Sequence, residues 1–378
     1  MASSPRTTSA RQLLTALTSS PHAAADGSSV VSSLGADWLR EQRLASMTWW
    51  MFRQANLSDD LQRDLRRAYY AAAGDAELHQ RELAHVLRQF NDQRIQVVVF
   101  KGAALAYGVY PDPACRTMGD IDLWVAEEDM ERARQALQEM GYERFRKPDR
   151  PPALMALFQG EIGLHHSDQG YGLVELHWGV FPGEWLRRVA AIDVDAVRHR
   201  IVRTRLVGEA AHILAPEDAI VQSVLHTAVN HQLSMSPLRA LVDIALLARH
   251  HPVDWSAIAQ RAQTWHVATV VWLVLSLAVD LVGLEEAAEA ARELQPSALR
   301  RRLIGRLANA GSLVTMRDLR ASKWRYVFLL LLIDRGRDAL RLIFRALWPE
   351  REWLIARYGQ YTFTTRLRHL FDAARGKI

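Results

Sequence analysis

Two aspartates, Asp120 and Asp122, are separated by one apolar residue within the apolar segment 119–125. Residues at i and i+2 of a β-strand point to the same face, so the two carboxylates would lie roughly 6–7 Å apart along the strand. Carboxylates this close resist joint ionisation unless a cation lies between them. The pattern therefore predicts a site that holds Mg²⁺, or Mn²⁺, against the phosphates of a nucleoside triphosphate.

A third carboxylate, Glu175, lies in a second alternating segment, 173–178. Its apolar residues share one strand face, which leaves Glu175 and His177 together on the other. If this strand pairs beside the first, Glu175 joins Asp120 and Asp122 as a third metal ligand, and His177 lies next to the carboxylates as a supporting group. A solvent-facing edge strand would show the same alternation, so the pattern alone leaves both interpretations open.

Basic residues and glycines precede the two aspartates. Lys101 and Gly102 end the β-branched run 96–100, while Arg116 and Gly119 lead into the acidic strand. A glycine permits close backbone approach, so a phosphate could lie against the amides at the start of the following helix. Lys101 and Arg116 could neutralise phosphate charge. We therefore predict that Lys101, Gly102, Arg116 and Gly119 bind the nucleotide.

The elements that must position these residues are predicted from the hydrophobic periodicity. A helical pattern covers 37–90, with helices at 60–73 and 75–90. Strands are predicted at 96–100, 120–125, 142–146, 162–166 and 173–178, with a helix at 127–140 and a hairpin at 201–207 and 211–214. Further helices are predicted at 216–231, 237–250, 254–265, 267–283, 296–309, 322–347 and 350–358. We expect four segments: a disordered tail (1–35), a helical segment (36–94), an α/β core (95–215) and a helical C-terminal region (216–378).

Composition limits the class of protein. The chain has 378 residues, one cysteine and a formal net charge of +5. A single cysteine, Cys115, excludes an internal disulfide and fits a cytoplasmic protein. The longest apolar run, 326–333, is too short to span a bilayer, so we expect no membrane association. No block of five cations occurs, so the sequence carries no clear nucleic-acid-binding signal.

Two residue pairs in the C-terminal region could carry chemistry. His226 and His231 are five residues apart and would not share a face of an α-helix, so ordinary core or surface histidines are favoured over a metal site. Arg239 and Asp243 have i,i+4 spacing, which predicts a local ion pair; the alternative is a cationic wall for the acceptor or base. The segment 340–348 is interpreted as an amphipathic helix with a solvated arginine face.

The motifs together resemble a known family. The segments that carry the resemblance are Val99–Leu105, Tyr110–Pro113, Arg116–Leu123, Val174–Trp178, Leu214–Asp218, Leu225–His231 and Arg239–Ile244. They resemble the bacterial uncharacterised nucleotidyltransferases, a family of the DNA polymerase β-like nucleotidyltransferase superfamily. The resemblance covers about residues 75–280. It implies an α+β fold with a minimal palm-like mixed sheet, flanked by N-terminal helices and a helical C-terminal region.

The same resemblance implies an activity. Asp120, Asp122 and Glu175 would bind Mg²⁺ and transfer a nucleoside monophosphate from an NTP, most simply ATP, to a hydroxyl-bearing acceptor, with release of pyrophosphate. The acceptor stays open among small molecules, peptides, proteins and RNA. One departure supports an alternative: most of the superfamily has Gly-Ser at the phosphate turn, where this chain has Gly102-Ala103. The alternative is a weakly active or inactive accessory protein that keeps the fold.

Overall fold

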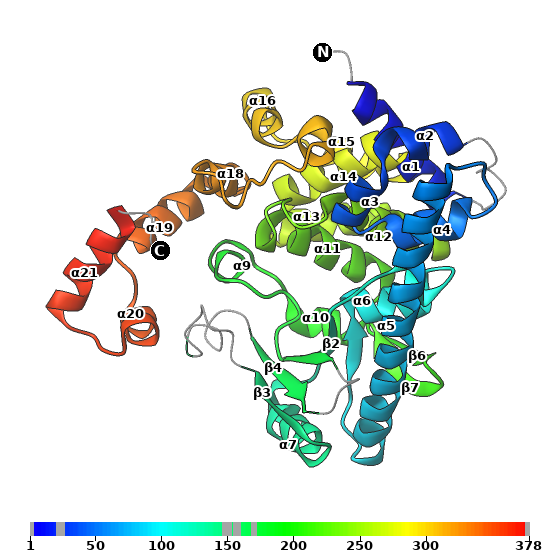
Figure 1. Cartoon of the computed structure of the whole chain (residues 1–378). Coiled ribbons are helices and arrows are strands. Elements are labelled where there is room, and N and C mark those ends of the chain that lie inside the picture. The colour runs from blue at the N-terminus through cyan, green and yellow to red at the C-terminus, as the bar shows by residue number, and fades with distance from the viewer. Residues whose placement is uncertain (1–3, 20–26, 146–152, 154–159, 168–171, 375–378) are drawn as a thin grey trace.

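A seven-stranded mixed sheet with the order β3-β4-β5-β2-β1-β7-β6 forms the lower part of the molecule in Figure 1. The computed structural model describes residues 4–19, 27–145, 153, 160–167 and 172–374. The strands are β1 (Val98–Phe100), β2 (Asp120–Trp124), β3 (Tyr142–Phe145), β4 (Glu161–His166), β5 (Leu173–His177), β6 (Val202–Leu206) and β7 (Glu209–Ile213). β2 pairs with β5 in parallel and with β1 in antiparallel orientation. This mixed sheet among helices confirms the predicted α+β fold.

The two faces of the central strands pack against different layers. Ile121 and Leu123 of β2 lie in a core formed with α5 (Asp59–Asp92) and α7 (Met130–Glu139). Trp124, from the opposite face of β2, belongs to the core shared with the C-terminal helices. Because side chains alternate along a strand, Asp120 and Asp122 are directed to that second face, toward the helical half of the molecule.

The N-terminal helices correct one expectation. Residues 1–35 were expected to form a disordered tail, but α1 (Pro5–Thr18) and α2 (Ser28–Leu34) lie within them. Leu13, Leu14 and Leu17 of α1 are fully buried in the core that includes α14 (Ala268–Val282). The segment is rich in serine, threonine and alanine, but these leucines have helical spacing and form an apolar stripe. The predicted helices at 60–73 and 75–90 are a single helix, α5, which continues through Gly74.

Helices make up the rest of the N-terminal and central parts: α3 (Ala36–Glu41), α4 (Ala45–Phe52), α6 (Lys101–Gly108), α9 (Glu184–Val189) and α10 (Val194–His199). The C-terminal region contains α11 (Pro216–Leu225), the π-helical turn η4 (His226–Asn230), α12 (Pro237–His250), α13 (Trp255–Thr264), α14, α15 (Ala288–Glu293), α16 (Ala298–Leu307) and α17 (Ala310–Val314). Within the described residues, no helix is both long and apolar enough to cross a membrane.

The last four helices leave the body of the molecule (Figure 1). They are α18 (Arg325–Leu331), α19 (Gly336–Leu347), α20 (Arg351–Tyr358) and α21 (Phe363–Ala374). The predicted helix at 322–347 is therefore two helices, and α21 was not predicted. The break lies at 332–335, where Asp334 accepts hydrogen bonds from the first backbone amides of α14 instead of continuing the helix.

Candidate active site

The sheet brings the three predicted carboxylates to one region. Asp122 on β2 lies directly opposite Glu175 on the parallel neighbour β5, and Asp120 lies two residues before Asp122 on the same face. On the other side of β5, the antiparallel strand β4 places Glu161 opposite His177. Glu161 was not predicted as a site residue, because the sequence does not show which strand β4 pairs with. Its alternation with Gly163 along β4 was the only signal.

The shortest contacts in this cluster converge on Asp122. Lys101 Nζ lies 2.6 Å from Asp122 Oδ1, and His177 Nε2 donates to the same oxygen at 2.9 Å. Glu175 Oε2 is 3.8 Å from His177 Nε2, and Glu161 Oε2 is 3.4 Å from His177 Nδ1. His177 is completely buried, with a ring nitrogen within 3.8 Å of a carboxylate oxygen of Asp122, Glu161 and Glu175.

These contacts also define the tightest group of ligand-type atoms. Asp122, Glu175 and His177 offer atoms that all lie within 4.8 Å of one another, the one such group of three or more among the described residues. Asp120 is outside this group and is more exposed than Asp122. The structure therefore places His177 closer to a metal position than the sequence predicted, and Asp120 at its outer edge.

The groups of the cluster shift the pKa values of its two aspartates in opposite directions. Burial raises the pKa of Asp120 to about 6, and the neighbouring carboxylates of Asp122 and Glu175 add to the effect. Burial alone would also raise the pKa of Asp122, but the Lys101 ammonium and the His177 hydrogen bond hold it well below its usual range. The pKa of Lys101 is raised in turn by Asp122 and Glu175, against the effect of its burial. The site thus carries one firmly ionised carboxylate beside one that resists ionisation.

The predicted phosphate turn is unusually constrained. Lys101 has a φ of 52° at the start of α6, a left-handed conformation that costs a non-glycine residue free energy. A Cβ at Gly102 would approach the Cβ of Met118 to 3.2 Å, so this glycine allows the close contact between the two segments. A Cβ at Gly119 would meet nothing within 4 Å, which leaves open space beside the first residue of β2.

Arg116 is not an unpaired phosphate ligand, because the structure pairs it with Asp243. Its Nε and Nη2 donate to the two carboxylate oxygens at 2.7 and 2.9 Å, and its Nη1 donates to the Thr117 carbonyl at 2.8 Å. The Tyr110 hydroxyl donates to the same carboxylate at 2.7 Å. The predicted local ion pair between Arg239 and Asp243 is therefore wrong. A planar guanidinium from another part of the chain takes both oxygens in a fork that the i,i+4 geometry does not provide.

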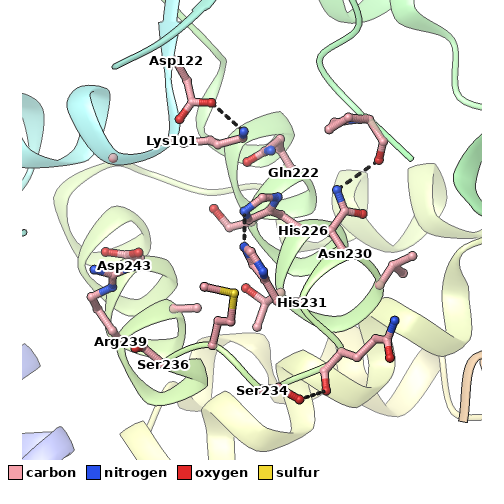
Figure 2. A pocket seen from close by; sticks show the side chains of 18 of the residues that line it. Lys101, Asp122, Gln222, His226, Asn230, His231, Ser234, Ser236, Arg239 and Asp243 are labelled. Carbon is pink, nitrogen blue, oxygen red and sulfur yellow. Dashed lines mark hydrogen bonds and ion pairs between the residues drawn. The ribbon is translucent and has the colours of Figure 1, made fainter. Parts of the chain in front are cut away.

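A cavity of about 1090 Å³ opens between the acidic cluster and the helical region. Its far wall is formed by α11, η4, the loop 231–236 and α12 (Figure 2). His226 and His231 lie on this wall with their Nε2 atoms 2.7 Å apart, so that one ring donates to the other. The prediction that they do not share a face is wrong because η4 is a π-helical turn, in which residues five apart lie above one another.

Both histidines of this pair are held neutral. Burial lowers the pKa of His226 well below its usual value, and the positive charge of Lys101 adds to this. Burial followed by the charge of Lys101 likewise lowers the pKa of His231 to about 4. The Nδ1 atoms of both rings are buried and lack hydrogen-bond partners within the described part of the chain. The far wall therefore carries a neutral donor and acceptor pair that the sequence did not predict.

Comparison with known families shows which protein family the chain belongs to. The family model described as uncharacterised nucleotidyltransferase matches residues 33–283. The chain belongs to this family. The matched range contains the entire sheet and the helical wall through α14, and with them most of the residues that line the cavity; Met316, Arg320 and Leu329 of the lining lie beyond it. Among curated proteins, no match to this nucleotidyltransferase was found. Helices α15–α21 lie beyond the matched range.

Proposed function

We propose that this nucleotidyltransferase moves a nucleoside monophosphate from an NTP to a hydroxyl group of an acceptor, with a divalent cation held by Asp120, Asp122 and Glu175. The observation that carries the proposal is the placement of these three carboxylates on neighbouring parallel strands at one wall of a large cavity. Nucleotidyl transfer needs positioned phosphates and charge neutralisation more than covalent chemistry from the protein. Family membership supports this reaction class.

The residues fit Mg²⁺ or Mn²⁺. Carboxylate oxygens are the ligands that these cations prefer, and the raised pKa of Asp120 reflects carboxylates that lack sufficient counter-charge. A bound cation would supply that charge and polarise the phosphate under attack. The imidazole of His177 is a ligand that Zn²⁺ and other transition metals favour more than Mg²⁺ or Mn²⁺ does. We assign it mainly to orienting Asp122 through their 2.9 Å hydrogen bond.

The remaining residues would position the substrates. The acceptor oxygen attacks the α-phosphorus, the bond from this phosphorus to the bridging oxygen breaks, and pyrophosphate leaves. Glu175 would receive the proton of the acceptor hydroxyl. Lys101, Gly102 and Gly119 would lie along the triphosphate, with ATP as the simplest donor. Arg116 would act indirectly, by fixing the segment that leads into β2 through its pair with Asp243.

A second function has its own support. Lys101 Nζ already neutralises Asp122 at 2.6 Å, and the turn Gly102-Ala103 offers no hydroxyl to a phosphate. Both features suit a protein that binds a nucleotide with little or no turnover. The observation that separates the two functions is turnover, since both would bind a metal and a nucleotide.

The test is pyrophosphate release from each of the four NTPs with Mg²⁺ or Mn²⁺, with cell extract as the source of acceptor. We expect release by the wild type and loss in Asp120→Asn and Asp122→Asn. The matched control is Asp60→Asn, an aspartate with an 89% exposed side chain on α5. Equal background rates in all four proteins, with each shown to be folded, would exclude the transferase function and leave the binding protein.

A further inference from the structure

Carboxylates and arginines line different parts of the cavity, which Lys101, Glu41 and Glu184 also line. Asp120, Asp122, Glu161 and Glu175 line the side formed by the sheet. The other side is lined by three arginines from separate parts of the chain: Arg43 from the turn before α4, Arg239 from α12 and Arg320 from the loop before α18. None of the three arginines forms an ion pair with a carboxylate of the described residues. A cavity built in this way can hold cations at one side and anions at the other.

Arg239 is held in the cavity wall by a single hydrogen bond and has no paired carboxylate among the described residues. Its Nη1 donates to the Thr117 carbonyl at 2.8 Å, and the part of the chain that the structure describes offers it no other hydrogen bond. The carboxylate of Asp243, whose charge acts on Arg239, already accepts hydrogen bonds from Arg116 and Tyr110. Burial and the charge of Arg116 lower the pKa of Arg239 to about 9. A partly buried guanidinium without a counter-ion is unfavourable until an anion binds to it.

The surroundings of His231 show that the three arginines act on the same space. Its pKa is lowered by burial and then, in decreasing order, by the charges of Lys101, Arg320, Arg239 and Arg43. Four cations from four different segments therefore contribute to the potential at one point on the far wall. Figure 2 shows Arg239 and His231 both on this wall, on the opposite side of the pocket from Asp122.

We propose that Arg239, together with Arg43 and Arg320, forms an anion subsite that binds a phosphate group at the wall facing the carboxylates. The planar guanidinium suits bidentate contact with phosphate oxygens. The proposal rests on the proposed function and extends it, because the phosphate belongs either to the triphosphate of the NTP or to a phosphorylated acceptor. It also replaces Arg116, which is paired with Asp243, as the main arginine that contacts phosphate.

The test measures ligand binding without turnover. Equilibrium binding of ATP, AMP, inorganic triphosphate and inorganic phosphate is compared for the wild type, Arg239→Gln and Arg239→Lys. The matched control is Arg249→Gln, an exposed arginine near the end of the same helix. We expect Arg239→Gln to weaken binding of inorganic triphosphate by about 10- to 100-fold, with a smaller loss in Arg239→Lys and none in the control.

The ligands separate the two sources of the phosphate. If ATP and inorganic triphosphate weaken together while AMP does not, the subsite binds the donor nucleotide. If inorganic phosphate alone weakens and ATP binding is unchanged, the subsite binds the acceptor. Should Arg239→Gln fail to fold, Arg320→Gln serves as the second variant. Unchanged binding of all four ligands by the folded variants would overturn the proposal.

Failure of the subsite and failure of the proposed function give different results. Loss of triphosphate binding in Arg239→Gln, without pyrophosphate release by the wild type, would support the subsite in a binding protein. Pyrophosphate release with unchanged phosphate binding would support the transferase and overturn the subsite.

A separate observation concerns the C-terminal arm, defined as residues 323–378, which lies beyond the range matched by the family. On α19, apolar residues with helical spacing are exposed to solvent: Leu340 (71%), Ile343 (43%), Phe344 (64%), Leu347 (53%) and the following Trp348 (45%). On α21, which contacts α19, two further apolar residues with helical spacing are exposed: Phe363 (73%) and Leu367 (51%). Apolar stripes of this kind normally pack against something.

The net charge of the arm indicates which kind of surface could cover these stripes. The arm carries twelve Lys and Arg against five Asp and Glu, a net charge of +7, while the rest of the chain has a net charge of −2. A second copy of the arm would be repelled by this charge. Amphipathic helices with arginines on the polar face and Trp, Phe and Leu on the other are typical of peripheral binding to anionic lipid surfaces. We infer, contrary to the expectation from the short apolar run alone, that the arm docks on an anionic membrane surface without spanning it.

The test is flotation of the full chain with vesicles of phosphatidylcholine alone and of phosphatidylcholine with phosphatidylglycerol. We expect binding to the anionic vesicles only, weakened by high salt and by Leu340→Asp. The matched control is Leu299→Asp, a 67% exposed leucine on α16 that lies outside the arm and should leave binding unchanged. Absence of binding, equal binding to neutral vesicles, or a stable homodimer that Leu340→Asp dissociates would overturn the inference.

Discussion

Replacing Asp120 with asparagine is expected to stabilise the metal-free protein above pH 6. Burial and the carboxylates of Asp122 and Glu175 raise the pKa of Asp120 from its usual value of 3.8 to about 6. Between these two values the unfolded chain has released the proton that the folded protein still holds. The free energy of unfolding therefore falls as the pH rises through this window, and the loss is complete above pH 6.

The size of the effect follows from the two pKa values. At 1.36 kcal/mol per pKa unit, the free energy of unfolding lost through this pKa difference is about 3 kcal/mol at pH 8 and roughly half of that at pH 5. Asparagine has nearly the same shape and no charge, so Asp120→Asn should avoid this penalty. The stability difference between variant and wild type should then be larger at pH 8 than at pH 5 by about 1–2 kcal/mol.

The assay is urea denaturation of both proteins with EDTA at pH 5 and pH 8, with Asp60→Asn as the exposed control. A divalent cation should offset the penalty in the wild type and stabilise Asp120→Asn less, since the variant keeps Asp122 and Glu175 but has lost one ionised carboxylate. A stability difference that stays constant or shrinks between pH 5 and pH 8 would refute the electrostatic reasoning about the cluster.

Three further predictions concern single residues. Asp243→Ala should lower the free energy of unfolding by about 3–5 kcal/mol because it leaves the buried Arg116 unpaired; a urea titration measures this, and a loss near zero would contradict the role of the pair. Leu13→Ala should cost about 2–5 kcal/mol because α1 is part of the core, and an unchanged melting temperature in calorimetry would speak against that packing. Lys101→Met should bind Mn²⁺ more tightly in an electron paramagnetic resonance titration, since the ammonium competes with the metal for Asp122; weaker binding would count against this competition.

Local patterns were sufficient to predict the central strands and their faces. The alternation in 119–125 and 173–178 placed Asp120, Asp122 and Glu175 on the correct strand face, and the hairpin formed by β6 and β7 was predicted, although β7 begins at Glu209 and not at 211. The family and the α+β fold are confirmed by the family match and the mixed sheet. The four domain boundaries and the roles of the site residues stay predictions.

Long-range contacts decided what the local patterns could not. The spacing of Arg239 and Asp243 was compatible with a local ion pair. The carboxylate of Asp243 instead pairs with Arg116, a buried arginine 127 residues away in the sequence. Glu161 acquired its place only through the register of β4 against β5. Neither contact leaves a signal in the spacing of neighbouring residues.

The sequence by itself determined which residues carry charge and which face of each strand they share, because the twofold alternation of a strand is a property of the local backbone. Only the tertiary structure decided which charges meet. It paired Lys101 with Asp122, brought His226 against His231 through a π-helical turn, and gathered Arg43, Arg239 and Arg320 around one cavity. The physical reason is that electrostatic and hydrogen-bond energies depend on distances in space, which strand register and helix packing set for the molecule as a whole.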